Sequence, residues 1–375
     1  MISALRSAGV LVVGVDRDHE TSSNVDRLIP VSVAPNDLGF AADAVFREMQ
    51  RLGGRIAGFP VLVDTELGLP LAMTLAPGNF KIFRDMRLLD KARQYEFLAA
   101  AGVDIPRWLI AADRPNVPTG SLFGGDVVVK PRSAWAASGV RFPSHDEIAS
   151  GDVIVQEAVY GDVVLLALEL AQRRPPKILG ALRHGRIPGA IRSGYSAVSV
   201  QPSEKLNALA MDVSQVLTGF QGVLQVEAIV DDFGVPHLLE VTPTLPNLLV
   251  RKLLGIELER VRSDGTLQFC VAPEPEGSRV AAWLYPETRG ARGNRFVAIR
   301  AQNQVMSGVT LLHPPRATRL RETGAPLGPV GIVLASATNL EEAARRLWEA
   351  AASTSLELDC GSVLGVMTLG LQDIL

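Results

Sequence analysis

QVEAIVDDFGVPHLLEVTPT, residues 225–244, reads as two strands joined by a turn at Phe233–Gly234. Side chains alternate between the two faces of a strand, so this hairpin would place Glu227 opposite Glu240, with Gln225 and Thr242 on the same face. The other face would be apolar and carry Leu224, Val226, Ala228, Val230, Leu239 and Val241. Carboxylates that oppose each other in a sheet repel. The pairing therefore predicts that a cation or a shared proton lies between them.

The composition narrows the class of protein. The chain has 375 residues, 47% of them hydrophobic, which is enough for two or three domains with a sizeable core. Its 37 basic and 40 acidic residues are interspersed, which argues against a nucleic-acid or membrane surface held by charge. Its apolar runs are shorter than the roughly 18 residues of a membrane span, and no signal pattern precedes them. Cys270 and Cys360 have neither metal-site nor disulfide spacing, as in a reducing cytoplasm. We expect a cytoplasmic protein that acts on small molecules.

The first 86 residues favour an α/β domain with a parallel sheet. The pattern indicates a strand over Val10–Val15, a helix over Phe40–Leu52 and a strand over residues 58–65. Such a domain normally opens with a strand and a Gly-rich turn, and neither is present, so the domain looks shortened at its start. Side chains that follow parallel strands line ligand crevices, which makes Asp64 and Thr65 candidate substrate contacts. A polar loop on a solvated edge is an equal alternative.

The middle of the chain alternates helices, strands and polar connections. A helix is expected from Asp90 to Gly102, and a buried strand that starts at Asp126 ends in Lys130. A cation at the end of a buried strand needs an anionic partner, unless its ammonium group reaches solvent. A small-residue loop and a second strand follow, and the strand runs into Gln156–Glu157. The polar residues 180–200 include Arg183, Arg186 and Arg192, which form either an anion site or a solvated basic loop.

The last third shows a helix and several strand-like segments. The helix has the apolar stripe Leu206, Leu209, Ala210, Val213 and Leu217 and ends at Gly219. Beyond Pro273, strands are expected over residues 279–285, 308–313 and 331–336. A second helix should begin with a capping box from Thr338 to Glu341.

In their order and spacing, these features resemble the ATP-grasp superfamily, in its carboxylate–amine ligase and carbamoyl-phosphate-synthase-like branch. The resemblance runs from about Val10 to Leu245 and extends less completely beyond. It implies an α+β fold, with a Rossmann-like domain followed by two subdomains that grip ATP. The implied domains are residues 1–86, 87–270 and 271–375, with a small nucleotide-gripping subdomain at about 115–160.

The resemblance also implies a ligand for each candidate residue. The phosphates of ATP would meet Lys91, Lys130 and the loop Ser133–Gly139, including Ser138 and Gly139. The adenosine moiety would meet Gln156, Glu157, the backbone of Ala158 and Val159, and, at the ribose, Asp162. Mg²⁺ would bind Glu227 and Glu240, with Thr242 as a neutral ligand. The transferred phosphoryl group would be stabilised by Arg192 or Arg183, and Arg186 would contact the substrate together with Asp64 and Thr65.

The implied reaction starts with the attack of a carboxylate on the γ-phosphate of ATP, and an amine then opens the resulting acylphosphate. The partners would be a small carboxylic acid, for example an amino acid, and an amine, and the protein could form a homodimer. The family usually has Asn-Pro-Arg where this chain reads Thr242-Pro243-Thr244. A second hypothesis is therefore a degenerate ATP-grasp protein that binds nucleotides or acts as a scaffold without turnover.

Overall fold

The fold was analysed in a computed structural model. It describes residues 11–16, 26–30, 38–51, 61, 63, 68–113, 118–133, 139–172, 174–186, 193–261, 267–272, 277–286, 296–301, 307–312, 331–358 and 363–368. The chain divides into two compact units. The first comprises Met1–Gly180, Pro202–Asn247 and Ile256–Val271, and the second comprises Ala181–Gln201, Leu248–Gly255 and Ala272–Leu375. The three-domain division expected from the sequence stays a prediction.

The chain begins with a small parallel sheet covered by a helix. Strand β1 (Val13–Asp16) pairs in parallel with β2 (Arg27–Pro30), and α2 (Leu38–Arg51) packs Ala41, Ala42 and Val45 against Ile29 and Leu71. The predicted helix is confirmed and the predicted first strand starts at Val13. The sequence reading missed β2, because its four residues carry no period-two pattern. Of the strand expected over residues 58–65, the structure describes only Val61 and Val63.

Two short helices connect this sheet to the rest of the first unit. They are α3 (Leu69–Leu75) and α4 (Lys81–Asp85). Phe80, which precedes α4, and Phe83, within α4, pack edge-on against Phe220, with ring centroids 5.6 Å and 4.9 Å from it. The side-chain amide of Asn79 exchanges two hydrogen bonds with the backbone of Gln221. These contacts anchor the start of the chain to the larger sheet of the unit.

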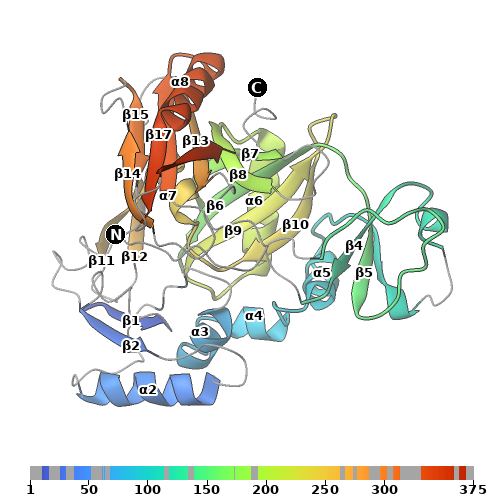
Figure 1. The fold of residues 1–375 in the computed structure, drawn as a ribbon. Coiled ribbons are helices and arrows are strands. Elements are labelled where there is room, and N and C mark those ends of the chain that lie inside the picture. Colours follow the sequence, from blue (N-terminus) through green and yellow to red (C-terminus); the bar gives the residue numbers. More distant parts are fainter. Residues whose placement is uncertain are drawn as a thin grey trace. The chain divides into compact units, whose positions relative to one another are not determined.

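A small sheet faces helix α5 (Lys91–Ala100), as Figure 1 shows. Its strands are β3 (Trp108–Ile110), β4 (Val127–Pro131) and β5 (Val153–Glu157), in the order β3-β5-β4 and all antiparallel. One face packs Ile154 against Ala92 and Tyr95 of α5, and the other face buries Val127, Val129 and Val155. The predicted α5, β4 and β5 are confirmed.

The larger sheet of the first unit carries the hairpin at residues 225–244. Strands β6 (Asp162–Leu170), β9 (Gly222–Val230) and β10 (Pro236–Thr242) lie in the order β10-β9-β6. Helix α6 (Glu204–Val216) covers this sheet with Leu206, Leu209, Ala210 and Val213, as its stripe predicted (Figure 1). A separate hairpin, β11 (Ile256–Val261) and β12 (Leu267–Val271), completes the unit. In this order, β10 is an edge strand.

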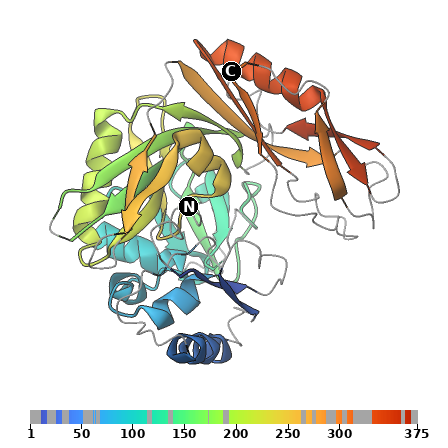
Figure 2. The ribbon, with the colours of Figure 1, turned by 90° about the vertical axis from the view of Figure 1, so that its left-hand side faces the viewer.

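The second unit, as far as its residues are described, is built on antiparallel strands covered by two helices. Its strands are the end of β7 (Lys177–Arg186), β8 (Ser193–Val200), β13 (Ser278–Pro286), β14 (Phe296–Ala301), β15 (Val309–Leu312), β16 (Gly331–Ala337), β17 (Thr354–Leu358) and β18 (Val363–Thr368). Its helices are α7 (Leu248–Leu254) and α8 (Leu340–Ala352). In Figure 2, α8 runs along the strands that it covers, and its Ala343, Ala344 and Leu347 pack on Val280 and Val333. The strands predicted beyond Pro273 are confirmed.

The predicted start of α8 was wrong by one residue. Asn339 is the N-cap, and its side-chain oxygen accepts a hydrogen bond of 2.9 Å from the backbone N–H of Glu342. Asn caps a helix at least as well as Thr. Asn339 directly precedes the first turn of α8, and it is therefore the N-cap in place of Thr338. No helix that the structure describes is long and apolar enough to span a membrane.

Candidate functional site

The hairpin turns through Asp231, whose side chain organises the loop. Its Oδ1 accepts hydrogen bonds from the backbone N–H groups of Phe233 and Val235, at 2.9 Å and 2.8 Å. The N–H of Gly234 bonds to the Asp231 carbonyl, and Gly234 takes a positive φ of 70°, which glycine adopts without strain. This five-residue loop joins the strands as a type I turn followed by a left-handed residue. The predicted turn is confirmed.

A bulge in β10 brings the two carboxylates onto one face. Leu238 pairs with Ala228, and the next pair is Glu240 with Glu227, so Leu239 is the extra residue. Without it, Leu239 would oppose Glu227, and Glu240 would point to the other face. The predicted pairing of Glu227 with Glu240 is confirmed. The prediction that Leu239 belongs to the apolar face was wrong: the fully buried residue is Leu238.

Helix α5 docks side chains onto the open edge of β10. The amide of Gln94, which is fully buried, donates to the Val241 carbonyl at 3.1 Å and accepts from the Val241 N–H at 3.3 Å. The hydroxyl of Tyr95 donates to the carbonyl of Leu239 at 2.9 Å. Unpaired backbone groups at a sheet edge are costly when buried. These two side chains satisfy them and fix α5 against the strand that carries Glu240.

Lys91 reaches Glu240 from the first turn of α5. Its Nζ lies 2.9 Å from Glu240 Oε1, and both side chains are mostly buried. The helix start is held by the N-cap Asp90, which accepts from the N–H of Ala92 and forms an ion pair with Arg132. The backbone N–H of Lys91 donates to the Arg132 carbonyl at 2.9 Å. Arg132 thus ties α5 to the end of β4, and its ion pair holds the pKa of Asp90 below its usual value despite partial burial.

Lys130 ends β4 in a buried position beside the same helix. Its Nζ donates to the Tyr95 hydroxyl at 2.6 Å and lies 5.0 Å from the centroid of the Tyr95 ring. Burial, together with the positive charge of Lys91, lowers the pKa of Lys130 to about 7, against a smaller opposite effect of Glu240. Burial and the charge of Glu240 raise the pKa of Tyr95, so its hydroxyl stays protonated. Two lysines from different elements therefore converge next to Glu240.

Gln156 presents a buried side-chain amide on the face of the small sheet that also carries Lys130. In register, Gln156 opposes Val128 and Ile154 opposes Lys130, so the side chains share one face. The amide lies beside the Tyr95 hydroxyl, and its interaction with that hydroxyl partly offsets the rise in the pKa of Tyr95. Its Nε2 makes no hydrogen bond of normal geometry with the described residues, so a ligand acceptor would complete its hydrogen bonding.

The neighbouring Glu157 points its carboxylate elsewhere. It forms two hydrogen bonds with Arg107, at 2.7 Å and 2.9 Å, which lower its pKa. Its backbone N–H bonds to the Arg107 carbonyl, and the N–H of Ala158 bonds to the Asp126 carbonyl. By contrast, the Ala158 carbonyl and the Val159 N–H have no hydrogen-bond partner within the described part of the chain. These two groups, rather than the Glu157 carboxylate, are open to a ligand.

Polar groups continue along the hairpin beyond the carboxylates. Gln225 Nε2 donates to the Thr244 hydroxyl at 2.7 Å, and both Thr242 and Thr244 are buried. The N–H of Leu245 donates to the Val63 carbonyl at 2.7 Å. The candidate substrate residues Asp64 and Thr65 follow Val63 directly in the chain but lie outside the described residues. The hairpin is therefore hydrogen-bonded to the residue that precedes them.

Other predicted residues are only partly described. Ser138 and Arg192 fall outside the described residues, and so does the side chain of Arg186, the last residue of β7. Arg183 lies on β7 opposite Val198 of β8, half-buried, so the basic stretch forms strands and not only a loop. Asp162 is exposed at the start of β6. Gly139 closes the loop after β4 with a φ of 74°, and an added Cβ would lie 2.8 Å from Pro131.

Sequence reasoning missed the importance of Tyr95 and Gln94. Neither residue is among the candidate site residues predicted from the sequence. A buried Gln inside an amphipathic helix was the available signal, because its side chain needs partners. Both bond to residues more than 140 positions away, which no local pattern indicates.

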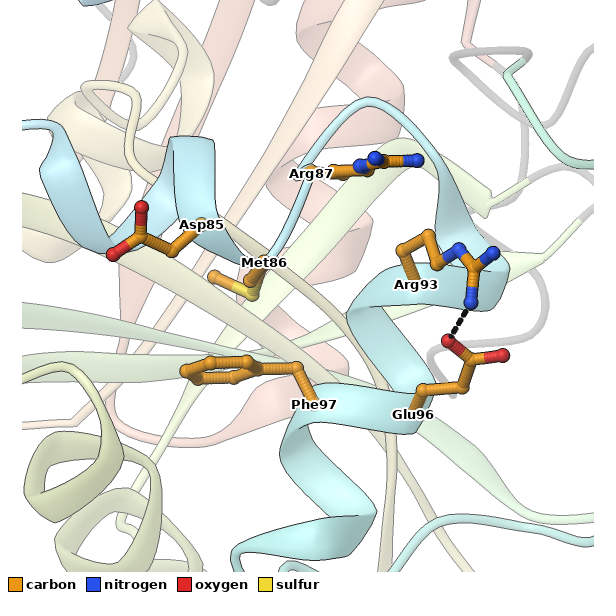
Figure 3. Close-up of a pocket in the computed structure, with 6 residues that line it drawn as sticks. All are labelled: Asp85, Met86, Arg87, Arg93, Glu96 and Phe97. Carbon is orange, nitrogen blue, oxygen red and sulfur yellow. Dashed lines mark hydrogen bonds and ion pairs between the residues drawn. The ribbon is translucent and has the colours of Figure 1, made fainter.

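A separate surface pocket lies behind α5. It has a volume of about 470 Å³ and is lined by Asp85, Met86, Arg87, Arg93, Glu96 and Phe97, with an ion pair between Arg93 and Glu96 (Figure 3). At 100° per residue, positions 93, 96 and 97 face away from positions 91, 94 and 95. None of the candidate site residues lines this pocket.

The chemistry of the converged residues fits a magnesium–nucleotide complex. Within the described ranges, no three His, Cys, Asp or Glu side chains gather as a metal cage. Mg²⁺ does not need one, because it commonly binds one or two carboxylates and completes its shell with phosphates and water. Opposed Glu227 and Glu240, two adjacent lysines and the buried amide of Gln156 match such a ligand in charge and hydrogen bonding.

Comparisons with known proteins identify relatives of the fold. No family model and no curated sequence matches the chain. Solved structures that match include an L-amino acid ligase from Bacillus licheniformis, with 16% identity, a TM-score of 0.69 and coverage of 95% of this chain and 94% of that one. N5-carboxyaminoimidazole ribonucleotide synthetase from Thermotoga maritima matches with 15% identity, a TM-score of 0.64 and coverage of 98% and 96%.

A third similar structure was solved with ligands. It is the biotin carboxylase domain dimer of the Hydrogenobacter thermophilus 2-oxoglutarate carboxylase, in complex with MgADP, ADP and bicarbonate. It has 14% identity, a TM-score of 0.66 and coverage of 97% of this chain and 88% of that domain. At such low identities, the likeness establishes a common fold over nearly the whole chain.

Proposed function

The chain has the ATP-grasp fold of carboxylate–amine ligases, and on this premise we propose that it is an ATP- and Mg²⁺-dependent ligase. It would join a small carboxylic acid, for example an amino acid, to an amine. The observation that carries the proposal is the convergence of Glu227, Glu240, Lys91 and Lys130 from four different elements. Two ammonium groups and two carboxylates suit a ligand of mixed charge, because phosphates pair with lysines and a divalent cation binds carboxylates.

The proposed nucleotide contacts are the two lysines and the groups beside them that can still form hydrogen bonds. Lys91 and Lys130 would bind the phosphates, together with the loop Ser133–Gly139. Gln156 Nε2, the Ala158 carbonyl and the Val159 N–H would meet the adenine, since adenine has both acceptors and a donor at its edges. Glu157 would shape this site through its backbone, because its carboxylate is paired with Arg107. Asp162 is the candidate at the ribose.

Mg²⁺ would be held by Glu227 and Glu240, with Thr242 as a neutral oxygen donor. When bound, the ion would neutralise charge on the phosphates. Lys91 currently pairs with Glu240, and it would turn to the phosphates when the metal takes its place. Thr244 already accepts a hydrogen bond from Gln225, which leaves Thr242 as the hydroxyl available to the metal.

In the proposed reaction, a carboxylate oxygen of the acid attacks the γ-phosphorus of ATP, and ADP leaves. The amine nitrogen then attacks the acyl carbon, and phosphate leaves as the C–N bond forms. Arg192, with Arg183 as the second candidate, would stabilise the transferred phosphoryl group. Asp64, Thr65 and Arg186 are the candidate contacts to the acid and the amine. The hydrogen bond from Leu245 to Val63 supports this, because it joins the segment of Asp64 to the hairpin.

The first experiment measures thermal shifts with a non-hydrolysable ATP analogue, with and without Mg²⁺. A ligand that binds only the folded state raises the midpoint of unfolding. We expect a Mg²⁺-dependent rise in the wild type and its loss in the double variant Glu227→Gln/Glu240→Gln. Glu169→Gln is the matched control, because Glu169 lies on β6 of the same sheet and bonds to the backbone of Phe269 instead. A wild type without any shift would contradict the proposal.

A second measurement tests turnover. ADP release is followed while pairs of small acids, including amino acids, and amines are supplied with MgATP. Release that depends on one pair supports the ligase. Nucleotide binding without ADP release for any pair would favour the nucleotide-binding or scaffolding module, for which the Thr242-Pro243-Thr244 sequence is the motivating observation.

A further inference from the structure

Tyr95 stands at the centre of the candidate site without belonging to the ligands expected there. It is fully buried on α5, one helical turn after Lys91, and its ring packs 5.7 Å from that of Trp108 on β3. Packing against Trp108 and Ile154 fixes the ring between α5 and the small sheet. Its hydroxyl group is therefore held at one point in space.

That hydroxyl bridges two elements through different hydrogen bonds. It donates its single proton to the Leu239 carbonyl at 2.9 Å, so its lone pairs are directed away from β10. Lys130 Nζ donates to it from the other side at 2.6 Å. Because the proton is committed to Leu239, the oxygen can act only as an acceptor toward Lys130. One hydroxyl thus orients the ammonium group of the buried lysine.

The acceptor of this proton is the bulged residue that sets the direction of Glu240. A bulge interrupts the strand ladder, and Leu239 is the extra residue between the pairs Leu238–Ala228 and Glu240–Glu227. The hydrogen bond from the Tyr95 hydroxyl gives the Leu239 carbonyl a partner at the point where the ladder is interrupted. The same bond therefore stabilises the backbone conformation that points Glu240 toward Glu227.

We propose that Tyr95 is a positioning residue of the nucleotide site, whose hydroxyl sets the place of Lys130 and the bulge that orients Glu240. The assignment of Lys130 to the phosphates and of Glu240 to the metal rests on the proposed function. The hydrogen bonds of the Tyr95 hydroxyl to Lys130 and Leu239 are independent of that function. Tyr95 touches neither ligand in this scheme and acts through the two residues that do.

The test compares Tyr95→Phe with Tyr160→Phe, using MgADP as the probe. Tyr95→Phe keeps the ring and removes only the bridging oxygen. Tyr160→Phe also removes one hydroxyl, which bonds to Asp126 at 2.5 Å on an exposed face of the small subdomain. Hydrogen bonds to charged groups are the stronger ones, so we expect Tyr95→Phe to weaken MgADP binding about tenfold or more. Tyr160→Phe should bind as the wild type does.

A third variant separates positioning from simple docking of the helix. Gln94→Met removes the hydrogen bonds of Gln94 to Val241, which also join α5 to β10, but the Gln94 side chain bonds to neither Lys130 nor Leu239. It should lower the midpoint of thermal unfolding and leave the pH profile of MgADP binding unchanged. Tyr95→Phe should shift that profile, because Lys130 then faces Lys91 on α5 and Glu240 on β10 without its hydroxyl acceptor. Equal profiles for both variants would overturn the proposal.

A readout without nucleotide keeps this inference distinct from the proposed function. The titration of Lys130 is followed by NMR of labelled lysine side chains in the nucleotide-free protein, with Lys130→Met identifying the signal. Loss of the acceptor should move the midpoint further down in Tyr95→Phe than in the wild type. An unmoved midpoint overturns the positioning role, whether or not the protein binds MgADP. Failure of the wild type to bind MgADP, with a moved midpoint, overturns only the nucleotide assignment.

Discussion

Single residues in the site show how burial alters ordinary side-chain chemistry. Lys130 follows a run of valines, and from the sequence it looks like an ordinary lysine near the end of a strand. In the structure it is buried beside Lys91 and an aromatic ring. Its pKa of about 7 means that the folded protein gives up a proton that the unfolded chain keeps until about pH 10.5. Folding is therefore opposed by this residue at neutral pH. A function that needs the positive charge explains why such a residue is present.

We predict that Lys130→Met stabilises the protein while weakening nucleotide binding. Replacing a buried charge by an apolar side chain of similar size should raise the free energy of unfolding at pH 7 by about 1–3 kcal/mol. The unfolded state binds more protons between pH 7 and 10.5, so the destabilising effect of Lys130 is largest below pH 7 and fades as the pH rises. Urea unfolding at several pH values measures this. A variant no more stable than the wild type at pH 7 contradicts it.

For single helices and strands, local sequence patterns predict the element but can leave one of its positions uncertain by one residue. The stripes of α6 and α8 were predictable because each helix buries one face. The N-cap of α8 was not, because Thr338 and Asn339 are both favourable caps and both have a glutamate three residues later. The contacts of the helix with β13 and β16 fix its start. The bulge at Leu239 is an ambiguity of the same kind in a strand.

We predict that Asn339→Ala lowers the free energy of unfolding by about 1 kcal/mol, since it removes the acceptor of the Glu342 N–H. Thr338→Ala is the matched control and should change stability by only a few tenths of a kcal/mol. Chemical denaturation of both variants gives the comparison. A larger loss for Thr338→Ala would restore the capping box expected from the sequence.

The whole molecule keeps its fold at sequence identities of 11–16% to the solved structures it matches. Its stability depends on pH through groups that the fold buries in different units. In the second unit, burial lowers the pKa of His184 to about 4, and its Nδ1 has no hydrogen-bond partner in the described part of the chain. The histidine is therefore neutral in the folded protein at neutral pH. A cytoplasmic location and a homodimer remain predictions from the sequence.

We predict that the protein loses stability as the pH falls from about 6.5 to 4, because the unfolded chain binds a proton at His184 that the folded state excludes. A shift of this size corresponds to at most roughly 3 kcal/mol. His184→Leu should remove that part of the acid sensitivity. His145→Gln is the control, since His145 is 73% exposed. Denaturation curves at pH 7 and pH 5 measure it, and an identical pH dependence in all three proteins would exclude His184 as the cause.

The sequence by itself determined the elements whose cause is local. Alternation predicted β9 and β10, the apolar stripe predicted α6, and the valine run predicted β4 with Lys130 near its end, because burial of side chains imposes a pattern on the chain. Only the tertiary structure decided how these elements meet. The bulge at Leu239 is one such feature, because it sets which face of the hairpin Glu240 occupies. The hydrogen bonds of Gln94 to Val241 and of Tyr95 to Leu239 are others, and each joins residues more than 140 positions apart. Such contacts depend on which buried groups still need a partner once the elements have packed, and that need arises only in the folded molecule.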